Sequence, residues 1–348
     1  MTTPVLTKRR RRRRLLTTLL VLVVVVLGAS ATIEHSQAMA GRAAHPMPGE
    51  LVDVGGHGLH VVRAGEGGPT VVLEAGSGEV ASGWEAVAAA LADDTTVIRY
   101  DRAGTAWSEP AGTPRTADAI VAELHTALEK TGAPKPYILV GHSLGGLYAR
   151  EFARQHPDDV AGLVLVDARP EDDARRTADL VPGGAGTAAL PTWIPTILKA
   201  TGVLRLGQSV LLDGLVPAGQ RREFLDVTAS PTYFATQREE ADLIGPTEEA
   251  LRGQDLGALP VRIIARGLPQ DYAAAGIDDA TGQQLERIWQ DGQRRMLTLS
   301  TDSRLVVAER SGHLVPAEQP DIIVDQVREL LGKETTMREA SATAARRR

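Results

Sequence analysis

The sequence predicts an α/β fold: a mostly parallel, eight-stranded sheet with helices on both faces and an inserted helical cap. Three observations predict it. Short apolar runs typical of buried strands alternate with longer segments whose apolar residues recur at helical spacing. This alternation requires parallel pairing with right-handed crossovers. Residues 169–257 are rich in proline and lack the alternation, so we expect them to form the mainly helical cap.

The composition indicates a globular protein with an attachment at one end. A chain of 348 residues with 43% apolar content can bury a substantial core. The absence of cysteine excludes disulfides and cysteine-ligated zinc or iron–sulfur sites. The net charge is −6 although residues 8–14 contribute seven positive charges, so the rest of the chain carries −13. This acidic balance argues against a nucleic-acid-binding surface.

Residues 1–33 have the pattern of a signal anchor or a signal peptide. The basic run at residues 8–14 precedes a mainly apolar stretch of 19 residues, from Leu15 to Ile33. This is about the length needed to cross a bilayer. We favour an uncleaved anchor with its basic end in the cytoplasm and the body of the protein outside the membrane.

Two other interpretations of this segment remain open. Ala29-Ser30-Ala31 fits a signal-peptidase cleavage pattern, which would release a secreted protein. Arg13 and Arg14, followed by two leucines, fit a twin-arginine signal. Residues 34–49 are polar and contain two prolines, and we interpret them as a linker.

The globular pattern begins at Glu50. Leu51–Val54 and Leu59–Arg63 are joined by a glycine-rich turn and predict a hairpin at a sheet edge. Thr70–Leu73 predicts a buried strand, which leads into the loop Glu74–Gly78. A predicted capping box then opens a helix with one apolar face; the box is Ser82 and Glu85, and the face is Trp84, Val87, Ala88 and Leu91.

Another strand and helix precede the centre of the sequence. Thr96–Tyr100 predicts a buried strand that ends in the turn Asp101–Gly104. The helix after it has His125 as a surface or packing residue and ends at Gly132; its inward residues are Ile120, Val121, Leu124 and Leu128.

Residues 137–146, YILVGHSLGG, predict a sharp turn between a buried strand and a helix that ends before Pro157. Gly141 and Gly145 leave room where side chains would collide. Ser143 would project from this turn with its hydroxyl exposed, and the free N–H groups of the helix start would face the same point.

The rest of the sheet follows the same logic. Ala161–Val166 predicts a strand with Asp167 at its carboxyl end, and Val261–Ala265 predicts the next strand after the cap. Catalytic groups of parallel sheets gather at these ends. Three further elements complete the body: a helix near residues 283–299, a last strand at Leu305–Ala308 and a closing helix at residues 320–332. His313 lies in the loop after the last strand. We interpret residues 334–348 as a disordered tail.

The segment GHSLGG after a strand resembles the serine-nucleophile members of the α/β-hydrolase superfamily, of the esterase and lipase kind. The resemblance extends over residues 50–333 and includes Asp101-Arg102-Ala103-Gly104, although Ala106 stands where glycine is usual. It implies that Ser143 is a nucleophile and His313 its general base. It also implies that the N–H groups of Ser77 and Leu144 form an oxyanion hole.

The acid of the implied triad has two candidates. The superfamily more often places it in the loop after the strand Val261–Ala265, where Asp271 lies. Asp167 ends the preceding strand directly and matches the position that some members use instead. We favour Asp167, because rigid elements hold the geometry of a site better than loops do.

The resemblance implies hydrolysis of a carboxylic ester through an acyl-enzyme, and the apolar cap residues favour an apolar small-molecule ester. We expect no cofactor and no metal. A cofactorless C–C hydrolase or perhydrolase with the same triad and a non-catalytic binding protein on the same scaffold are the alternatives. Haloalkane and epoxide hydrolysis are disfavoured, because those relatives carry aspartate at the position of Ser143. For the cap region, the alternative is a membrane-touching element.

Overall fold

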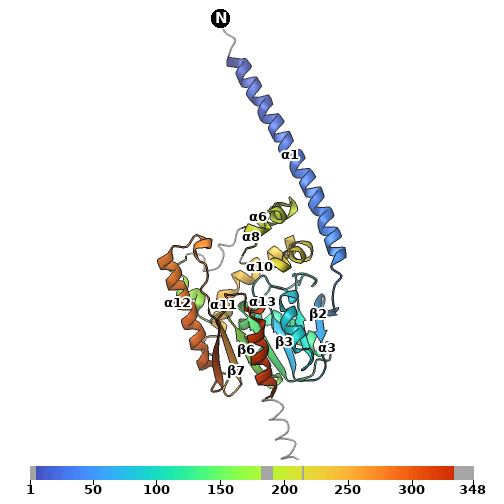
Figure 1. The fold of residues 1–348 in the computed structure, drawn as a ribbon. Helices are drawn as coiled ribbons and strands as arrows, with labels where there is room; N and C mark the ends of the chain where they lie inside the picture. The colour runs from blue at the N-terminus through green and yellow to red at the C-terminus, as the bar shows by residue number, and fades with distance from the viewer. Residues whose placement is uncertain (1–4, 182–190, 214, 333–348) are drawn as a thin grey trace, which may run out of the picture. The chain divides into compact units, whose positions relative to one another are not determined.

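The computed structural model describes residues 5–181, 191–213 and 215–332. The chain divides into two compact units: residues 1–46 with residues 191–234, and residues 47–190 with residues 235–348. The second unit contains the sheet, and the first contains the N-terminal helix (Figure 1). The tail expected at residues 334–348 lies outside the described residues.

The sheet of the second unit has eight strands in the order β1-β2-β4-β3-β5-β6-β7-β8. The pairs β1–β2 and β2–β4 are antiparallel and all others are parallel, as the sequence predicts. The strands are β1 (Glu50–Asp53), β2 (Gly58–Ala64), β3 (Thr70–Glu74), β4 (Val97–Tyr100), β5 (Tyr137–His142), β6 (Val160–Val166), β7 (Val261–Arg266) and β8 (Ser303–Ala308).

Helices cover both faces of this sheet. One face carries α3 (Ala117–Lys130), α4 (Leu144–Gln155) and the α12–η6 segment (Asp279–Arg295 and Met296–Leu299). The other face carries α2 (Glu85–Leu91) and the helix at residues 320–332. The two faces have separate apolar cores because successive residues of a strand point to opposite sides: Val72 packs into the first core, and Val71 and Leu73 into the second.

The start of α2 differs from the sequence prediction. The predicted apolar face is correct, since Trp84, Val87 and Leu91 are buried. The capping box is wrong: a 3₁₀ turn, η1 (Ala81–Trp84), precedes α2, and no side chain caps either element. Ser82 therefore lies inside the turn, and Glu85 forms an ion pair with Arg99.

Between β6 and β7, the described residues form helices and turns but no strand. They include α5 (Asp173–Thr177), α6 (Trp193–Ala200), α7 (Val203–Leu206), α8 (Gln208–Leu211), η3 (Ala218–Gln220), α9 (Arg221–Glu223), the π-helix η4 (Phe224–Thr228), α10 (Pro231–Asp242) and α11 (Ile244–Ala250). The unit that contains the sheet also has a short helix, α13 (Val315–Glu318), and two short 3₁₀ turns, η2 (Pro157–Asp159) and η5 (Ala273–Ala275).

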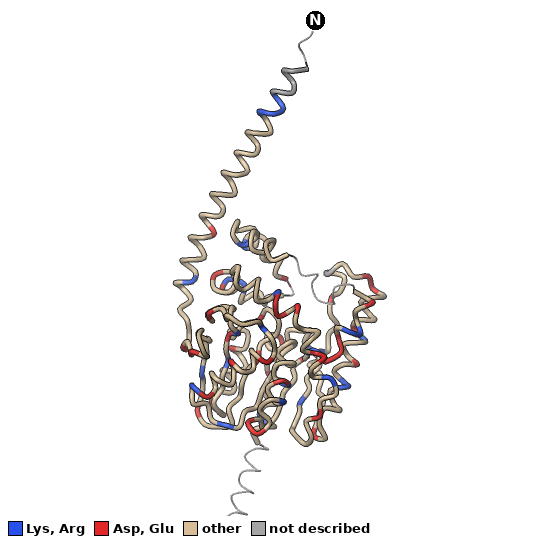
Figure 2. Tube along the Cα trace, turned by 180° about the vertical axis from the view of Figure 1, so that it is seen from behind, with Lys and Arg blue, Asp and Glu red and all other residues tan. Residues whose placement is uncertain are grey.

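The first unit is built on one long helix, α1 (Val5–Ala44), of 40 residues and therefore about 60 Å. Of the described residues, only the segment Arg11–Ala44 of this helix is long and apolar enough to cross a membrane. Figure 2 shows its uncharged middle after the basic start. Residues 34–49, expected to be a linker, are helical as far as Ala44, because this part of α1 packs against α6, α9 and η4.

Candidate active site

Ser143 lies on the turn between β5 and α4 in a strained backbone conformation, with φ of 50° and ψ of −120°. Two glycines make the turn possible. A Cβ on Gly141 would lie 2.5 Å from the carbonyl oxygen of Gly145, and a Cβ on Gly145 would lie 2.5 Å from that of Glu74. The glycines predicted to leave room at this turn therefore do so by close backbone approach.

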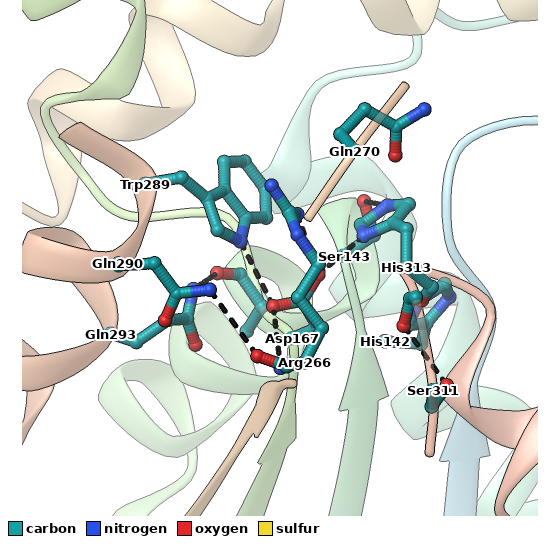
Figure 3. Close-up of polar contacts among 12 residues, drawn as sticks. His142, Ser143, Asp167, Arg266, Gln270, Trp289, Gln290, Gln293, Ser311 and His313 are labelled. Carbon is teal, nitrogen blue, oxygen red and sulfur yellow. Dashed lines mark hydrogen bonds and ion pairs between the residues drawn. The ribbon is translucent and has the colours of Figure 1, made fainter. Parts of the chain in front are cut away.

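Ser143, His313 and Asp167 form a continuous hydrogen-bonded chain (Figure 3). The Ser143 Oγ lies 3.0 Å from His313 Nε2. The His313 Nδ1 lies 2.6 Å from Asp167 Oδ2. The three side chains follow the carboxyl ends of β5, β8 and β6, so the sheet brings together residues that are far apart in the sequence.

Asp167 is fully buried and accepts hydrogen bonds from three other residues. Besides His313, the donors are Trp289 Nε1 at 2.9 Å, and the Arg266 guanidinium at 2.9 Å and backbone N–H at 3.2 Å. Burial by itself raises the pKa of Asp167, but the hydrogen bond from His313 and the charge of Arg266 hold it well below its usual range. Asp167 is therefore a carboxylate at neutral pH.

Arg266 is the last residue of β7. The loop after this strand is the place where, by the resemblance given above, the superfamily more often has its acid. The Arg266 guanidinium bridges Asp167 and Glu286, at 2.9 and 2.6 Å, and lies 5.0 Å from the centroid of the Trp289 ring. Asp271, the alternative acid, is exposed and accepts the backbone N–H of Ala274 at 3.1 Å. The sequence alone did not indicate that Arg266 and Trp289 contact Asp167. A cation at the end of an apolar strand could have indicated that Arg266 has a buried acidic partner.

His142 is the last residue of β5, and it couples the turn at Ser143, called the elbow here, to the loop that carries His313. Its Nδ1 lies 2.8 Å from Glu79 Oε2, and its Nε2 lies 2.7 Å from the backbone oxygen of His313. Both partners are acceptors, so the two contacts stabilise the form of His142 in which both ring nitrogens carry a hydrogen. Burial alone lowers the pKa of His142, but the adjacent carboxylate outweighs it and the pKa is raised. The sequence analysis gave Glu79 no role.

The predicted oxyanion donors lie at two loop ends. Leu144 is the first residue of α4, where a backbone N–H has no intrahelical acceptor. In the loop after β3, the Gly76 N–H donates to Glu79 at 2.8 Å. The next residue is Ser77, whose hydroxyl donates to Gln237 at 3.3 Å. The expected oxyanion donor is the backbone N–H of Ser77, not this hydroxyl.

Arg102 holds the loop after β3 in place by hydrogen bonds. The buried guanidinium donates to the backbone oxygens of Ala75 and Gly76, at 2.6 and 2.8 Å. It also pairs with Glu74 and Glu240, at 2.8 and 2.9 Å. With both carbonyls fixed, the orientation of the peptide units that follow is fixed as well. The turn Asp101–Gly104 therefore contacts the loop after β3 through Arg102.

One group among the described residues has the side chains for a metal ion: His125, His156 and Asp159, whose ligand atoms lie within 4.8 Å of one another. The two imidazole rings are stacked, with centroids 3.8 Å apart and planes 2° from parallel. Lone pairs in parallel planes do not converge on one ion. Asp159 is also paired with Lys135 at 2.8 Å, and we infer no metal centre here.

Fold and site together define an α/β hydrolase. A sequence model described as "Alpha/beta hydrolase family" matches residues 71–326, which is most of the chain. The chain therefore belongs to this family and is a hydrolase.

The proteins that are similar to this chain have names that refer to different activities. The chain is 27% identical over 302 residues to a protein named probable transporter efuK from Hormonema carpetanum, covering 80% of this chain but only 42% of that protein's length. The Cif epoxide hydrolase from Acinetobacter nosocomialis matches with a TM-score of 0.65 at 16% identity, over 86% of this chain and 96% of that one.

A thermophilic esterase from Thermogutta terrifontis matches with a TM-score of 0.52 at 22% identity, over 80% of this chain and 94% of that one. At these identities, the solved structures establish the fold and leave the substrate open.

Proposed function

We propose that the protein is a serine hydrolase that cleaves a carboxylic ester through an acyl-enzyme. The observation that carries the proposal is the chain of hydrogen bonds from Ser143 through His313 to Asp167, at 3.0 and 2.6 Å. In this proposal Ser143 is the nucleophile, His313 the general base and Asp167 the acid, while the N–H groups of Ser77 and Leu144 stabilise the oxyanion.

The proposed reaction begins when His313 Nε2 removes the proton of Ser143 Oγ as this oxygen attacks the ester carbonyl carbon. The carbonyl electron pair moves to the oxygen, which then accepts from the N–H groups of Ser77 and Leu144. Collapse of the tetrahedral intermediate breaks the C–O bond, and His313 gives its proton to the leaving alcohol. Water, deprotonated by His313, then releases the acid and restores Ser143.

Asp167 supports both steps without changing its own protonation. Because the pKa of Asp167 is held low, it stays ionised, fixes Nδ1–H of His313 as donor and stabilises the imidazolium. Arg266 shares the same carboxylate oxygen as His313. We infer that this cation and Trp289 hold Asp167 in place.

An epoxide substrate is less well supported, although several similar structures are epoxide hydrolases. Relatives of that kind, by the resemblance given above, carry aspartate where this chain has Ser143. A C–C hydrolase or perhydrolase would share the triad, so substrate tests must separate these reactions. A binding protein would need no hydrogen-bonded Ser–His–Asp chain.

The experiment is a panel of p-nitrophenyl esters of increasing acyl length with the full chain in detergent, alongside labelling by a fluorophosphonate. We expect Ser143→Ala to abolish labelling and lower turnover by several orders of magnitude. Ser77→Ala is the matched control: it removes a hydroxyl near the site but keeps the backbone N–H, so turnover should stay within a few-fold. Equal activity of Ser143→Ala and wild type would refute the proposal.

We further propose that α1 is an uncleaved membrane anchor and that the body lies outside the cytoplasmic membrane. The support is the basic run at residues 8–14, the apolar stretch that follows it, and a helix long enough to span a bilayer.

A further inference from the structure

In the unit formed by residues 1–46 and 191–234, the short helices α6, α7 and α8 expose apolar side chains. Trp193 is 61% exposed, Ile197 50%, Leu206 84% and Val210 78%. Other residues of the same helices are buried: Leu204 packs into a small core with Phe224, Leu225 and Tyr233. Among the described residues, packing therefore buries some side chains of these helices and leaves Trp193, Ile197, Leu206 and Val210 exposed.

The turn between α6 and α7 is fixed to α1. The Ser30 hydroxyl donates to the backbone oxygen of Thr201 at 2.5 Å. Glu34 is only 4% exposed and pairs with Lys199 and with Arg205, the latter at 2.7 Å. Two cations on one buried carboxylate give an attachment with a defined geometry.

A second contact lies further along α1. Arg205 also pairs with Asp226 of η4 at 2.7 Å, and Gly41 of α1 faces that carboxylate so closely that a Cβ would lie 2.1 Å from it. The C-terminal part of α1 is thus an integral part of this unit.

The attachment points coincide with the end of the apolar stretch. The 19 residues from Leu15 to Ile33 span about 28 Å as a helix, close to the thickness of the hydrocarbon core. Ser30 and Glu34 therefore lie at the level where α1 leaves the bilayer. Helices α6 and α7, held at these residues, must lie at the same level, where tryptophan and short amphipathic helices are favoured.

We propose that the exposed apolar side of α6–α8 binds the lipid bilayer from which α1 emerges. The occupant is the interface of the membrane, because α1 and these helices form one unit and α1 fixes their depth. An exposed set of large apolar residues on a soluble surface would otherwise be unfavourable. The proposal is independent of the esterase chemistry and rests on α1 crossing the membrane.

The absence of cysteine allows a direct test, because each single-cysteine variant carries one spin label. The full chain is placed in nanodiscs of phosphatidylcholine and phosphatidylglycerol, with labels at Leu206→Cys, Val210→Cys, Val24→Cys and Glu129→Cys. Val24, in the apolar stretch, is the lipid reference, and Glu129, 54% exposed on its side chain in the other unit, is the water reference. Collision with oxygen and with a water-soluble nickel chelate is measured by electron paramagnetic resonance.

We expect the ratio of oxygen to nickel accessibility at Leu206 and Val210 to exceed that at Glu129 several-fold and to approach that at Val24. Ratios equal to Glu129, with Val24 in lipid, would overturn the proposal. Shielding of both labels from both reagents would also overturn it, because a protein surface or second copy would then cover the helices. Since the two positions lie on separate short helices, one disturbed label does not decide the result.

Discussion

At the scale of single residues, the choice of the acid has the most consequence. Asp167 is buried against His313, whereas Asp271 is exposed and bonded to its own loop. We predict that Asp167→Asn lowers kcat by roughly 10⁴, because an amide cannot hold His313 in the required tautomer. Single-turnover and steady-state rates on the best p-nitrophenyl ester measure this.

Asp271→Asn is the matched control and should leave kcat within a few-fold of wild type. Asp167→Asn also deprives the buried Arg266 of a carboxylate, so thermal unfolding must show that the variant is folded. If Asp271→Asn showed the large loss and Asp167→Asn did not, the acid would have to be reassigned to Asp271.

A second residue-scale prediction concerns Ala106, which stands where the family resemblance leads us to expect glycine. Its φ is 41°, in the left-handed region that disfavours a side chain by about 1–2 kcal/mol. We predict that Ala106→Gly raises the free energy of unfolding by roughly 0.5–1 kcal/mol, after the larger entropy of unfolded glycine is subtracted.

Denaturant unfolding in one detergent condition measures this change. Ala122→Gly, at an exposed position inside α3, is the control and should lower the free energy of unfolding by about 0.5–1 kcal/mol. Destabilisation by both substitutions to a similar extent would show that the backbone at Ala106 carries no relievable strain.

At the scale of elements, the Glu79–His142 pair ties the loop after β3 to the elbow and to the loop of His313. Burial alone raises the pKa of Glu79, but the charge of His142 and its hydrogen bonds lower it to about 2. A carboxyl group with a lowered folded pKa stabilises the fold above its unfolded pKa, near 4.5. That contribution is lost as the pH falls toward 2.

We therefore predict that Glu79→Gln destabilises the protein at pH 6 and that the difference from wild type shrinks as the pH falls from 4.5 toward 2. The raised pKa of His142 has the opposite sign: its contribution is complete below 6.5 and is lost as the pH rises through the folded value. Unfolding by denaturant at a series of pH values measures how the free energy of unfolding changes in both pH ranges. Glu129→Gln, at an exposed carboxylate, is the control, and a pH-independent difference for Glu79→Gln would contradict the assignment.

At the scale of the whole molecule, the prediction concerns location. If α1 is an anchor with its basic end in the cytoplasm, protease added to intact cells should digest the body and leave a cytoplasmic marker protein intact. Protection of the body until the cells are lysed would show the opposite orientation. A soluble body with an N-terminus after Ala31 would instead show cleavage and secretion.

The sequence by itself determined which strands and helices follow one another along the chain, and most of their bounds. The strands from Thr70 to Ala308 are short apolar runs between polar turns, so local composition defines them without knowledge of their neighbours. Ser143 could be found in the same way, because the turn that exposes it needs glycine at fixed local positions, Gly141 and Gly145. The start of α2 could not, since a 3₁₀ turn and a capping box use the same small polar residues.

Only the tertiary structure decided which distant groups meet. Asp167 and His313 are 146 positions apart, and their contact depends on the order of β6, β7 and β8 in the sheet. The contacts of Arg266 with Asp167, of Glu79 with His142, and of Glu34 with Arg205 likewise join separate elements. Their strength comes from burial, and burial is a property of the packed chain that local sequence does not contain.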